Sequence, residues 1–467
     1  MTTFSSVRNP TVAAIREQLN HPIIDADGHL TEFMPLVRDY VREVGGADLA
    51  ESFHQLTRNV WQSGKGFRPV RVYNGLPAKN TLDRMTSTLP ELLYARLDEI
   101  GIDFALLYPS FGLLAMYHPD AEMRQVTARA LNRYCAENFE GFRDRLEPVA
   151  VIPMFTPEEA ISELDYAVGD LGLKCAVMSG VIPRFESRDG REEPWVDTLG
   201  HESLYDYDPV WSKCMDLGVV PAFHGIGYGW GSRISATNYV YNHLGNFGAA
   251  QEAVLRSLVI GGVPRRFPDL RMTFLEGGVS WACQLFADLL SHFEKRNKEA
   301  VTAFDDRFLD IDLATDLFAT YGHGPMSGMA SRFERSARRA ATTPDHPAGY
   351  DDFAESLING PGDIVDMFSR QFYFGCEADD PLNSLAFRRD LVPQGIRLNA
   401  VFASDIGHWD VTNVRDVLPE AWELVEHEQI SRQDFFEFSC GSVARMLTSM
   451  NPDFFKGTVV ADRPLTE

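Results

Sequence analysis

The residue types and spacing with the clearest chemical meaning lie in the segment IIDADGHLTE near the N-terminus. If this segment is an extended strand, alternation places Asp25, Asp27 and His29 on one face. Buried and unpaired, such groups would cost several kcal/mol, so they must pair with one another or with an arginine, or bind a cation. The segment alone leaves both interpretations open.

Four further apolar runs end in a residue of the same kind, namely VVPAFH, RMTFLE, YFGCE and AVFASD, which end at His224, Glu276, Glu377 and Asp405. One buried strand that ends in a polar residue is unremarkable. Several such strand ends at one level of a barrel are what a metal site requires. The predicted metal ligands are Asp27, His29, His224 and Asp405.

The elements that must position these residues are short segments rich in β-branched and apolar side chains, most of them followed by a helical pattern. Eight such segments occur, at residues 23–29, 103–108, 147–152, 174–178, 219–224, 271–276, 371–376 and 399–404. Alternating strands and helices are typical of a parallel sheet, and eight strands are the number that a closed barrel needs. The sequence therefore predicts an α/β fold, a (β/α)8 TIM barrel.

Two long stretches interrupt the alternation, at about residues 31–97 after the first strand and 290–369 after the sixth. We expect both to be insertions in a barrel that spans residues 21–450, with an N-terminal extension at 1–20 and a C-terminal tail at 451–467. Insertions at strand C-terminal ends usually form lids, pocket walls or subunit contacts. The second insertion carries four arginines, Arg332, Arg335, Arg338 and Arg339. We favour a solvated helical face for them over a dedicated binding patch.

The composition excludes several classes of protein. Of 467 residues, 45% are hydrophobic and 24% are charged, as in an ordinary globular protein. A net charge of −24 would repel nucleic acid and anionic membranes. The chain has no apolar run of the roughly 18 residues that span a bilayer and no signal-peptide pattern. We therefore expect a cytoplasmic protein with a small-molecule substrate and no nucleic-acid or membrane partner.

Three of the motifs, DADGHLTE, FHG and ASDIGHWD, resemble the first, fifth and eighth strand motifs of the amidohydrolase-related superfamily. That superfamily contains metal-dependent hydrolases and decarboxylases, and relatives of aminocarboxymuconate semialdehyde decarboxylase are the most similar branch. The resemblance covers about residues 21–450. It implies that Asp27 and His29 are first-strand ligands, His224 the fifth-strand ligand and Asp405 the eighth-strand aspartate.

The sequence departs from the superfamily pattern in its first strand, which reads D-x-H instead of H-x-H and is followed by Glu32. A carboxylate in place of an imidazole shifts the metal preference from zinc towards iron or manganese. With Glu32, Glu276 and His243 added, the site would resemble the dinuclear iron or iron/manganese centres of monooxygenases that hydroxylate small molecules such as 2-aminoisobutyrate. Glu32 is equally well explained as a first-turn helix residue.

Residues around the predicted centre complete the candidate site. Glu276, Asp405 and His408 are candidate catalytic residues, since a carboxylate or imidazole beside a metal can move a proton. The loop HGIGYGWG lacks the spacing of a phosphate-binding loop, and it offers Tyr228 and Trp230 as substrate walls. Arg68 and Arg71 in the first insertion are candidates to meet an anionic substrate group.

Three functions remain in view. The first is O2-dependent hydroxylation at a dinuclear Fe/Mn site, with electrons from an electron-transfer partner. The alternative is a mononuclear hydrolase or decarboxylase, for example with a single zinc ion that lowers the pKa of its water or polarises a substrate carboxyl. The third is a metal-binding partner subunit of a hetero-oligomeric enzyme. We expect a homo- or hetero-oligomer in each case.

Overall fold

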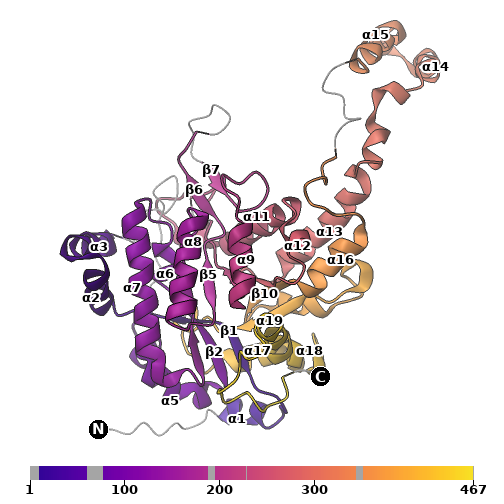
Figure 1. Cartoon of the computed structure of the whole chain (residues 1–467). Helices are drawn as coiled ribbons and strands as arrows, with labels where there is room; N and C mark the ends of the chain where they lie inside the picture. The colour runs from indigo at the N-terminus through magenta and orange to yellow at the C-terminus, as the bar shows by residue number, and fades with distance from the viewer. Residues whose placement is uncertain (1–9, 60–76, 188–194, 228, 343–350, 466–467) are drawn as a thin grey trace.

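The computed structural model describes residues 10–59, 77–187, 195–227, 229–342 and 351–465. Parallel strands lie at the centre of the molecule and helices surround them (Figure 1). The strands of the two parallel sheets are β1 Ile24–Leu30, β2 Phe104–Pro109, β3 Leu146–Pro148, β4 Ala150–Ile152, β5 Ala176–Met178, β8 Pro221–Phe223, β9 Met272–Phe274, β10 Phe372–Glu377 and β11 Asn399–Ala403. Two further strands, β6 Ile182–Arg184 and β7 Trp195–Asp197, form an antiparallel hairpin.

The strand order is β1-β2-β3 in one sheet and β11-β10-β9-β8-β5-β4 in the other. All eight predicted strand segments occur, and one of them is divided into β3 and β4 at Val149. The Val149 N–H donates to the Leu107 carbonyl at 2.9 Å, and the next N–H, of Ala150, donates to the Cys175 carbonyl at 2.9 Å. At the opposite edges, Asp405 N–H donates to the Asp27 carbonyl at 3.0 Å. The predicted α/β arrangement with parallel strands is therefore confirmed.

The helices fill the connections between strands. They are α1 Pro10–Arg16, α2 Met34–Gly45, α3 Ala47–Asn59, α4 Thr81–Thr86, α5 Pro90–Ile100, α6 Gly112–Ala115, α7 Ala121–Phe139, α8 Pro157–Leu164, α9 Asp208–Leu217, α10 Tyr239–His243, α11 Asn246–Ile260, α12 Val263–Arg266, α13 Ser280–Arg296, α14 Ile311–Tyr321, α15 Ala330–Ala340, α16 Pro361–Arg370, α17 Val417–Glu426, α18 Arg432–Phe436 and α19 Ser442–Met450. None of these described helices is long and apolar enough to cross a membrane.

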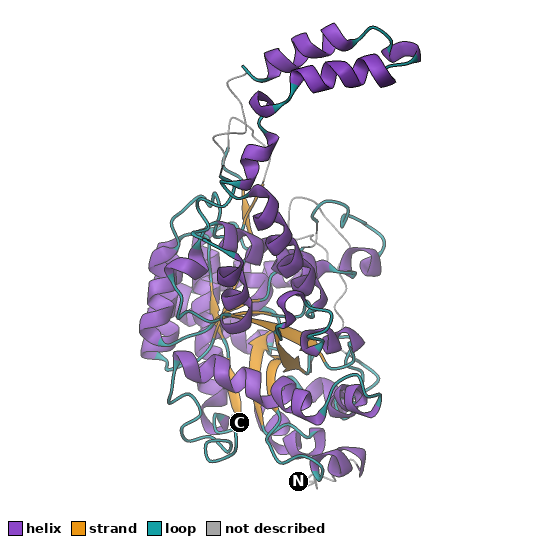
Figure 2. Ribbon diagram, turned by 90° about the vertical axis from the view of Figure 1, so that its right-hand side faces the viewer, coloured by secondary structure: helices purple, strands orange, loops and turns teal. Residues whose placement is uncertain are grey.

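In chain order, helices α2 to α5 connect β1 to β2, and helices α13 to α16 connect β9 to β10. These are the two places where the sequence interrupts the alternation of strand and helix. Of these helices, α14 and α15 stand well away from the strands in both views (Figures 1 and 2).

Alternate side chains of the strands enter two different hydrophobic clusters. Along β2, Phe104, Leu106 and Tyr108 join an inner cluster with the other strands and α19, whereas Ala105 and Leu107 join an outer cluster with the surrounding helices. Both faces of the strands are thus buried, as expected for parallel strands covered by helices. Polar side chains on the inner face therefore need a partner inside the molecule.

A buried ion pair joins the two strands of the β6–β7 hairpin, and a hydrogen bond connects the hairpin to Tyr207. Arg184 lies 2.9 Å from Asp197, both side chains are at most 3% exposed, and Arg184 also donates to the Tyr207 hydroxyl at 2.9 Å. Replacing Arg184 with methionine leaves the Asp197 charge buried without its partner. We expect Arg184→Met to lower the free energy of unfolding by about 3–5 kcal/mol, measured by urea denaturation. A loss below about 1 kcal/mol, the scale of an exposed pair, would contradict this account.

Candidate metal centre

The C-terminal ends of β1, β8 and β11 bring the four predicted ligands together, and each is at most 3% exposed. His29 Nε2 lies 3.5 Å from Asp27 Oδ1 and 3.4 Å from Asp405 Oδ1. His224 Nε2 lies 3.8 Å from Asp27 Oδ1. The ligand atoms form two overlapping groups, each within 4.8 Å, namely Asp27, His29 and His224, and His29, Asp405 and His408. Residues distant in sequence therefore meet at one point.

An irregularity in β1 decides which side chains face this point. The pairing of β1 with β2 shifts between Asp25 and Gly28. Ile24 and Ala26 belong to the inner cluster, whereas Asp25 pairs with Ala105, a residue of the outer cluster. The expectation that Asp25 shares a face with Asp27 and His29 is therefore wrong, because the shift breaks the simple alternation of the strand.

Asp25 has a positioning role on the outer side of β1. Its carboxylate accepts hydrogen bonds from the Ser404 N–H at 2.9 Å and the Ser404 hydroxyl at 2.5 Å, so it ties β1 to the residue before Asp405. A Cβ on Gly28 would lie 2.6 Å from Asp25 Oδ2, closer than atoms can approach. Glycine at position 28 therefore makes room for the carboxylate that joins the two strands.

Two site residues hold an uncommon backbone conformation. Glu276 has φ 59° and Asp405 has φ 49°, in the left-handed region that residues with a Cβ seldom adopt. Glu276 lies two residues after the end of β9, and Asp405 lies two residues after the end of β11. A left-handed backbone conformation is strained, and it persists only where the surrounding structure holds the residue in place, as at many functional sites. Here it occurs at two residues whose carboxylates face the same centre.

Burial makes the charged forms of these ligands costly. It raises the pKa of Asp27 to about 7, raises the pKa of Asp405 well above its usual value, and lowers the pKa of His29. Among the described residues, Asp27 Oδ1, His29 Nε2 and Asp405 Oδ2 have no hydrogen-bond partner. A divalent cation would satisfy these atoms and offset the cost of burying the carboxylates, so the residues fit a metal ion.

Glu276 and His408 lie against the four ligands. Glu276 Oε2 is 3.0 Å from His224 Nε2, and Glu276 Oε1 is 3.4 Å from His408 Nδ1. His408 Nδ1 is also 2.5 Å from Asp405 Oδ1, and its ring stacks on that of His29 at 3.7 Å. Burial alone would raise the pKa of Glu276, but His224 and His408 reverse this and lower it. Glu276 therefore links two imidazoles of the centre.

Glu32 does not join either group of candidate ligands. Its two carboxylate oxygens accept hydrogen bonds from the N–H groups of Phe111 at 3.0 Å and Gly112 at 2.9 Å. Burial raises the pKa of Glu32 to about 7. The residue precedes α2 instead of lying in its first turn, and it binds the backbone at the start of α6.

The other sequence candidates lie at varying distances from the centre. The His243 ring is 5.7 Å from that of Phe247, which in turn is 5.5 Å from the His224 ring, and His243 is in neither ligand group. Trp230 is half-buried against the outer cluster. Tyr228, Arg68 and Arg71 lie outside the described residues.

A cavity of about 510 Å³ lies beside the centre, lined by Glu276, His243, Phe247, Trp281 and the residues around them. The fully buried Asn246 also lines it and accepts from the Gly227 N–H at 2.5 Å. Asn246 Nδ2 and Trp281 Nε1 have no hydrogen-bond partner among the described residues. Neither residue was predicted from the sequence, where the available signals were an asparagine at the start of a helix and an aromatic residue soon after a strand.

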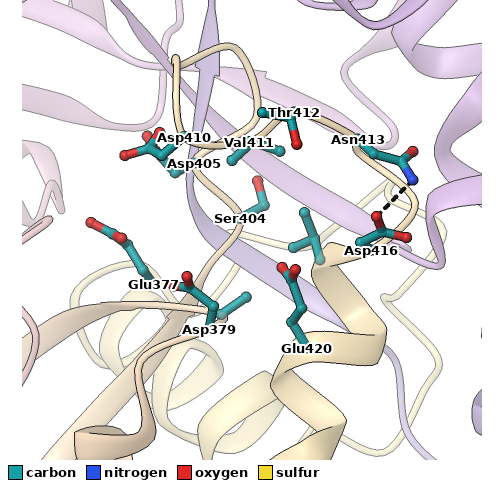
Figure 3. Close-up of a pocket in the computed structure, with 12 residues that line it drawn as sticks. Glu377, Asp379, Ser404, Asp405, Asp410, Val411, Thr412, Asn413, Asp416 and Glu420 are labelled. Carbon is teal, nitrogen blue, oxygen red and sulfur yellow. Dashed lines mark hydrogen bonds between the residues drawn. The ribbon is translucent and has the colours of Figure 1, made fainter. Parts of the chain in front are cut away.

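Asp405 lines a second, acidic cavity (Figure 3). Glu377 and Asp410 face it together with Asp405, and Asn413 donates to Asp416 at 2.7 Å. Burial, with Glu276 and Asp410, raises the pKa of Glu377 to about 9. Burial therefore favours the protonated form of this carboxyl group, which ends β10.

Comparisons with solved structures show the same fold in known proteins. An amidohydrolase from Mycobacterium avium subsp. paratuberculosis is 16% identical, with 92% of this chain and 98% of that chain covered and a TM-score of 0.53. A 5-carboxyvanillate decarboxylase from Novosphingobium aromaticivorans, solved with bound manganese, is 12% identical, with 92% and 97% covered and a TM-score of 0.51. No curated protein matches this chain.

The family described as amidohydrolase matches residues 24–320, which is more than half of the chain. This match includes β1 and β8, which carry Asp27, His29 and His224. The resemblance drawn from the strand motifs is thereby confirmed. The chain belongs to the amidohydrolase family and is a metal-dependent enzyme.

Proposed function

We propose that this enzyme is a decarboxylase of small carboxylic acids that uses one divalent metal ion held by Asp27, His29, His224 and Asp405. The convergence of these buried ligands, with three ligand atoms that have no other partner among the described residues, carries the proposal. The manganese-bound 5-carboxyvanillate decarboxylase with this fold supports it. These comparisons favour the hydrolase or decarboxylase alternative over O2-dependent hydroxylation.

We also propose that the two sheets form one closed (β/α)8 barrel at residues 21–450, with insertions at about 31–97 and 290–369. Hydrogen bonds between the β1 and β11 ends support closure, since Asp405 N–H donates to the Asp27 carbonyl and His29 N–H to the Ile406 carbonyl. The continuity of β3 and β4 through Val149 supports it at the other edge. In such a barrel, the ligands lie at the face where active sites are built.

One metal ion is favoured over two, because both Glu32 oxygens are already bound to backbone N–H groups. Two carboxylates in the ligand set favour manganese or iron over zinc. When bound, the cation would hold the substrate carboxyl group and draw electron density from it.

The protein groups beside the ligands are suited to proton transfer. In decarboxylation, the bond from carbon to the carboxyl group breaks, CO2 leaves, and the electron pair that stays on carbon takes a proton. We propose His408 as the donor of that proton. Its Nδ1 faces Asp405 and Glu276, which fix the ring, and its Nε2 lies 3.4 Å from the Ser110 hydroxyl.

The cavity beside Glu276 is the proposed substrate pocket. Phe247 and Trp281 line it and offer flat apolar walls to a substrate. Because Trp281→Ala removes one of these apolar walls, we expect KM to rise about 5- to 10-fold with kcat nearly unchanged. Steady-state kinetics check this, and a fall in kcat alone would contradict a binding role.

The proposed function is tested by measuring CO2 release from a panel of hydroxybenzoates and carboxylated phenols, with manganese-loaded enzyme in the absence of O2. We expect turnover of at least one of these acids and none with the Asp27→Ala variant. Turnover that requires both O2 and a reductant would overturn decarboxylation in favour of hydroxylation.

A further inference from the structure

Helices α14 and α15 form an arm, defined as residues 311–340, that projects from the rest of the chain (Figures 1 and 2). The two helices pack on each other, with the rings of Phe318 and Phe333 5.1 Å apart. The arm follows α13 through two short helices, Ala300–Phe304 and Asp306–Phe308. None of its residues belongs to either group of candidate metal ligands found among the described residues.

One face of α14 is apolar and exposed. Leu313, Leu317 and Tyr321 recur every four residues and so lie on one face of the helix, with exposed fractions of 55%, 47% and 72%. Phe308, just before the helix, is 76% exposed. No residue of α14 is buried. A contiguous apolar surface of this kind marks a protein contact, because exposing it to water is costly.

The charges of the arm are divided between its two helices. Asp312 and Asp316 are exposed on α14, which has no basic residue. α15 has a single acidic residue, Glu334, and four exposed arginines at positions 332, 335, 338 and 339. A two-fold axis that passes between the two α14 helices would place the acidic residues of each beside the basic helix of the other. The arm is therefore complementary to itself, as an isologous interface requires.

We propose that the arm is covered by the arm of a second copy of this chain. The apolar stripes of the two α14 helices meet at the centre of the contact, and Asp312 and Asp316 of each copy face arginines of the other. The chain as a whole has a net charge of −24, so two copies repel each other at long range. The arginines of α15 form a positive surface that would attract the acidic residues of the second copy and offset this repulsion. This proposal does not depend on the proposed reaction.

The first experiment measures the mass of the full-length protein by light scattering after gel filtration. We expect a dimer, and we expect Leu317→Glu to raise the dissociation constant at least about 10-fold, because the charge would be buried at the centre of the contact. Leu391→Glu is the matched control, since Leu391 is 59% exposed on another part of the chain, and it should remain dimeric. A monomeric wild type, or an unchanged Leu317→Glu dimer, would overturn the proposal.

A charge exchange tests whether the two arms contact each other. We expect the double variant Asp312→Lys/Asp316→Lys and the double variant Arg335→Glu/Arg339→Glu each to be largely monomeric, because each places like charges opposite one another. Mixing the two should restore a dimer that contains one copy of each, detectable by native mass spectrometry. If both variants stay dimeric alone, or if their mixture stays monomeric, the arms do not form the contact.

Discussion

Replacing His224 with alanine should remove metal binding and lower kcat/KM by more than about 100-fold, because changes even to groups that only support a metal ligand cost about 10- to 100-fold. His224 is fully buried, and its Nε2 faces both Asp27 and Glu276. No other described imidazole replaces it in the group that contains Asp27 and His29. Metal content after dialysis, together with steady-state rates, measures both effects.

His243→Ala is the comparison for this experiment. His243 lines the cavity beside Glu276 and is in neither ligand group, so we expect its alanine variant to keep its metal. If the His243→Ala variant loses its metal, His243 is a metal ligand, as the sequence predicted. Full metal occupancy in both His224→Ala and Asp27→Ala would refute the ligand set.

Asp405→Asn is expected to weaken metal affinity and to keep kcat more than about 100-fold below the wild-type value even at saturating metal. Asparagine has nearly the shape of aspartate and tolerates the left-handed φ of 49°, so the fold should persist. The amide lacks the negative charge that faces His29 at 3.4 Å and His408 at 2.5 Å. Metal titration followed by kinetics at each metal concentration separates the two losses.

Asp405→Ala provides the control for backbone strain. Alanine lacks the side-chain polar group that makes the left-handed region tolerable, so this variant should also melt at a lower temperature than Asp405→Asn. If Asp405→Asn recovers the wild-type kcat once metal is saturating, Asp405 serves only as a ligand whose charge is dispensable, and its proposed contact with His408 has no catalytic consequence.

Much of the strand framework could be predicted from the sequence, because a buried parallel strand needs a short apolar run and most of the runs are followed by helical periodicity. The same logic located His224, Glu276 and Asp405 at strand ends. It failed at β1, where regular alternation predicted Asp25 beside Asp27. A register shift next to Gly28 depends on the neighbouring strand, which a single segment does not reveal.

Other features depend on contacts between residues far apart in the chain. The Glu32 carboxylate accepts hydrogen bonds from the N–H groups of Phe111 and Gly112, about 80 residues later in the chain. The sequence around Glu32 does not predict these partners. Asn246 and Trp281 line the cavity only because α11 and α13 begin on the same side of the centre. The arginines of the second insertion were correctly expected on an exposed helix, but the apolar stripe of α14 beside them was not.

The account is tested most directly by titrating metal-depleted wild-type protein with Mn²⁺ and measuring how many ions bind per chain. It predicts one ion per chain, with binding lost in Asp27→Ala and His224→Ala. Two ions per chain would contradict the mononuclear site and favour the dinuclear alternative, and an absence of binding would contradict the metal centre itself.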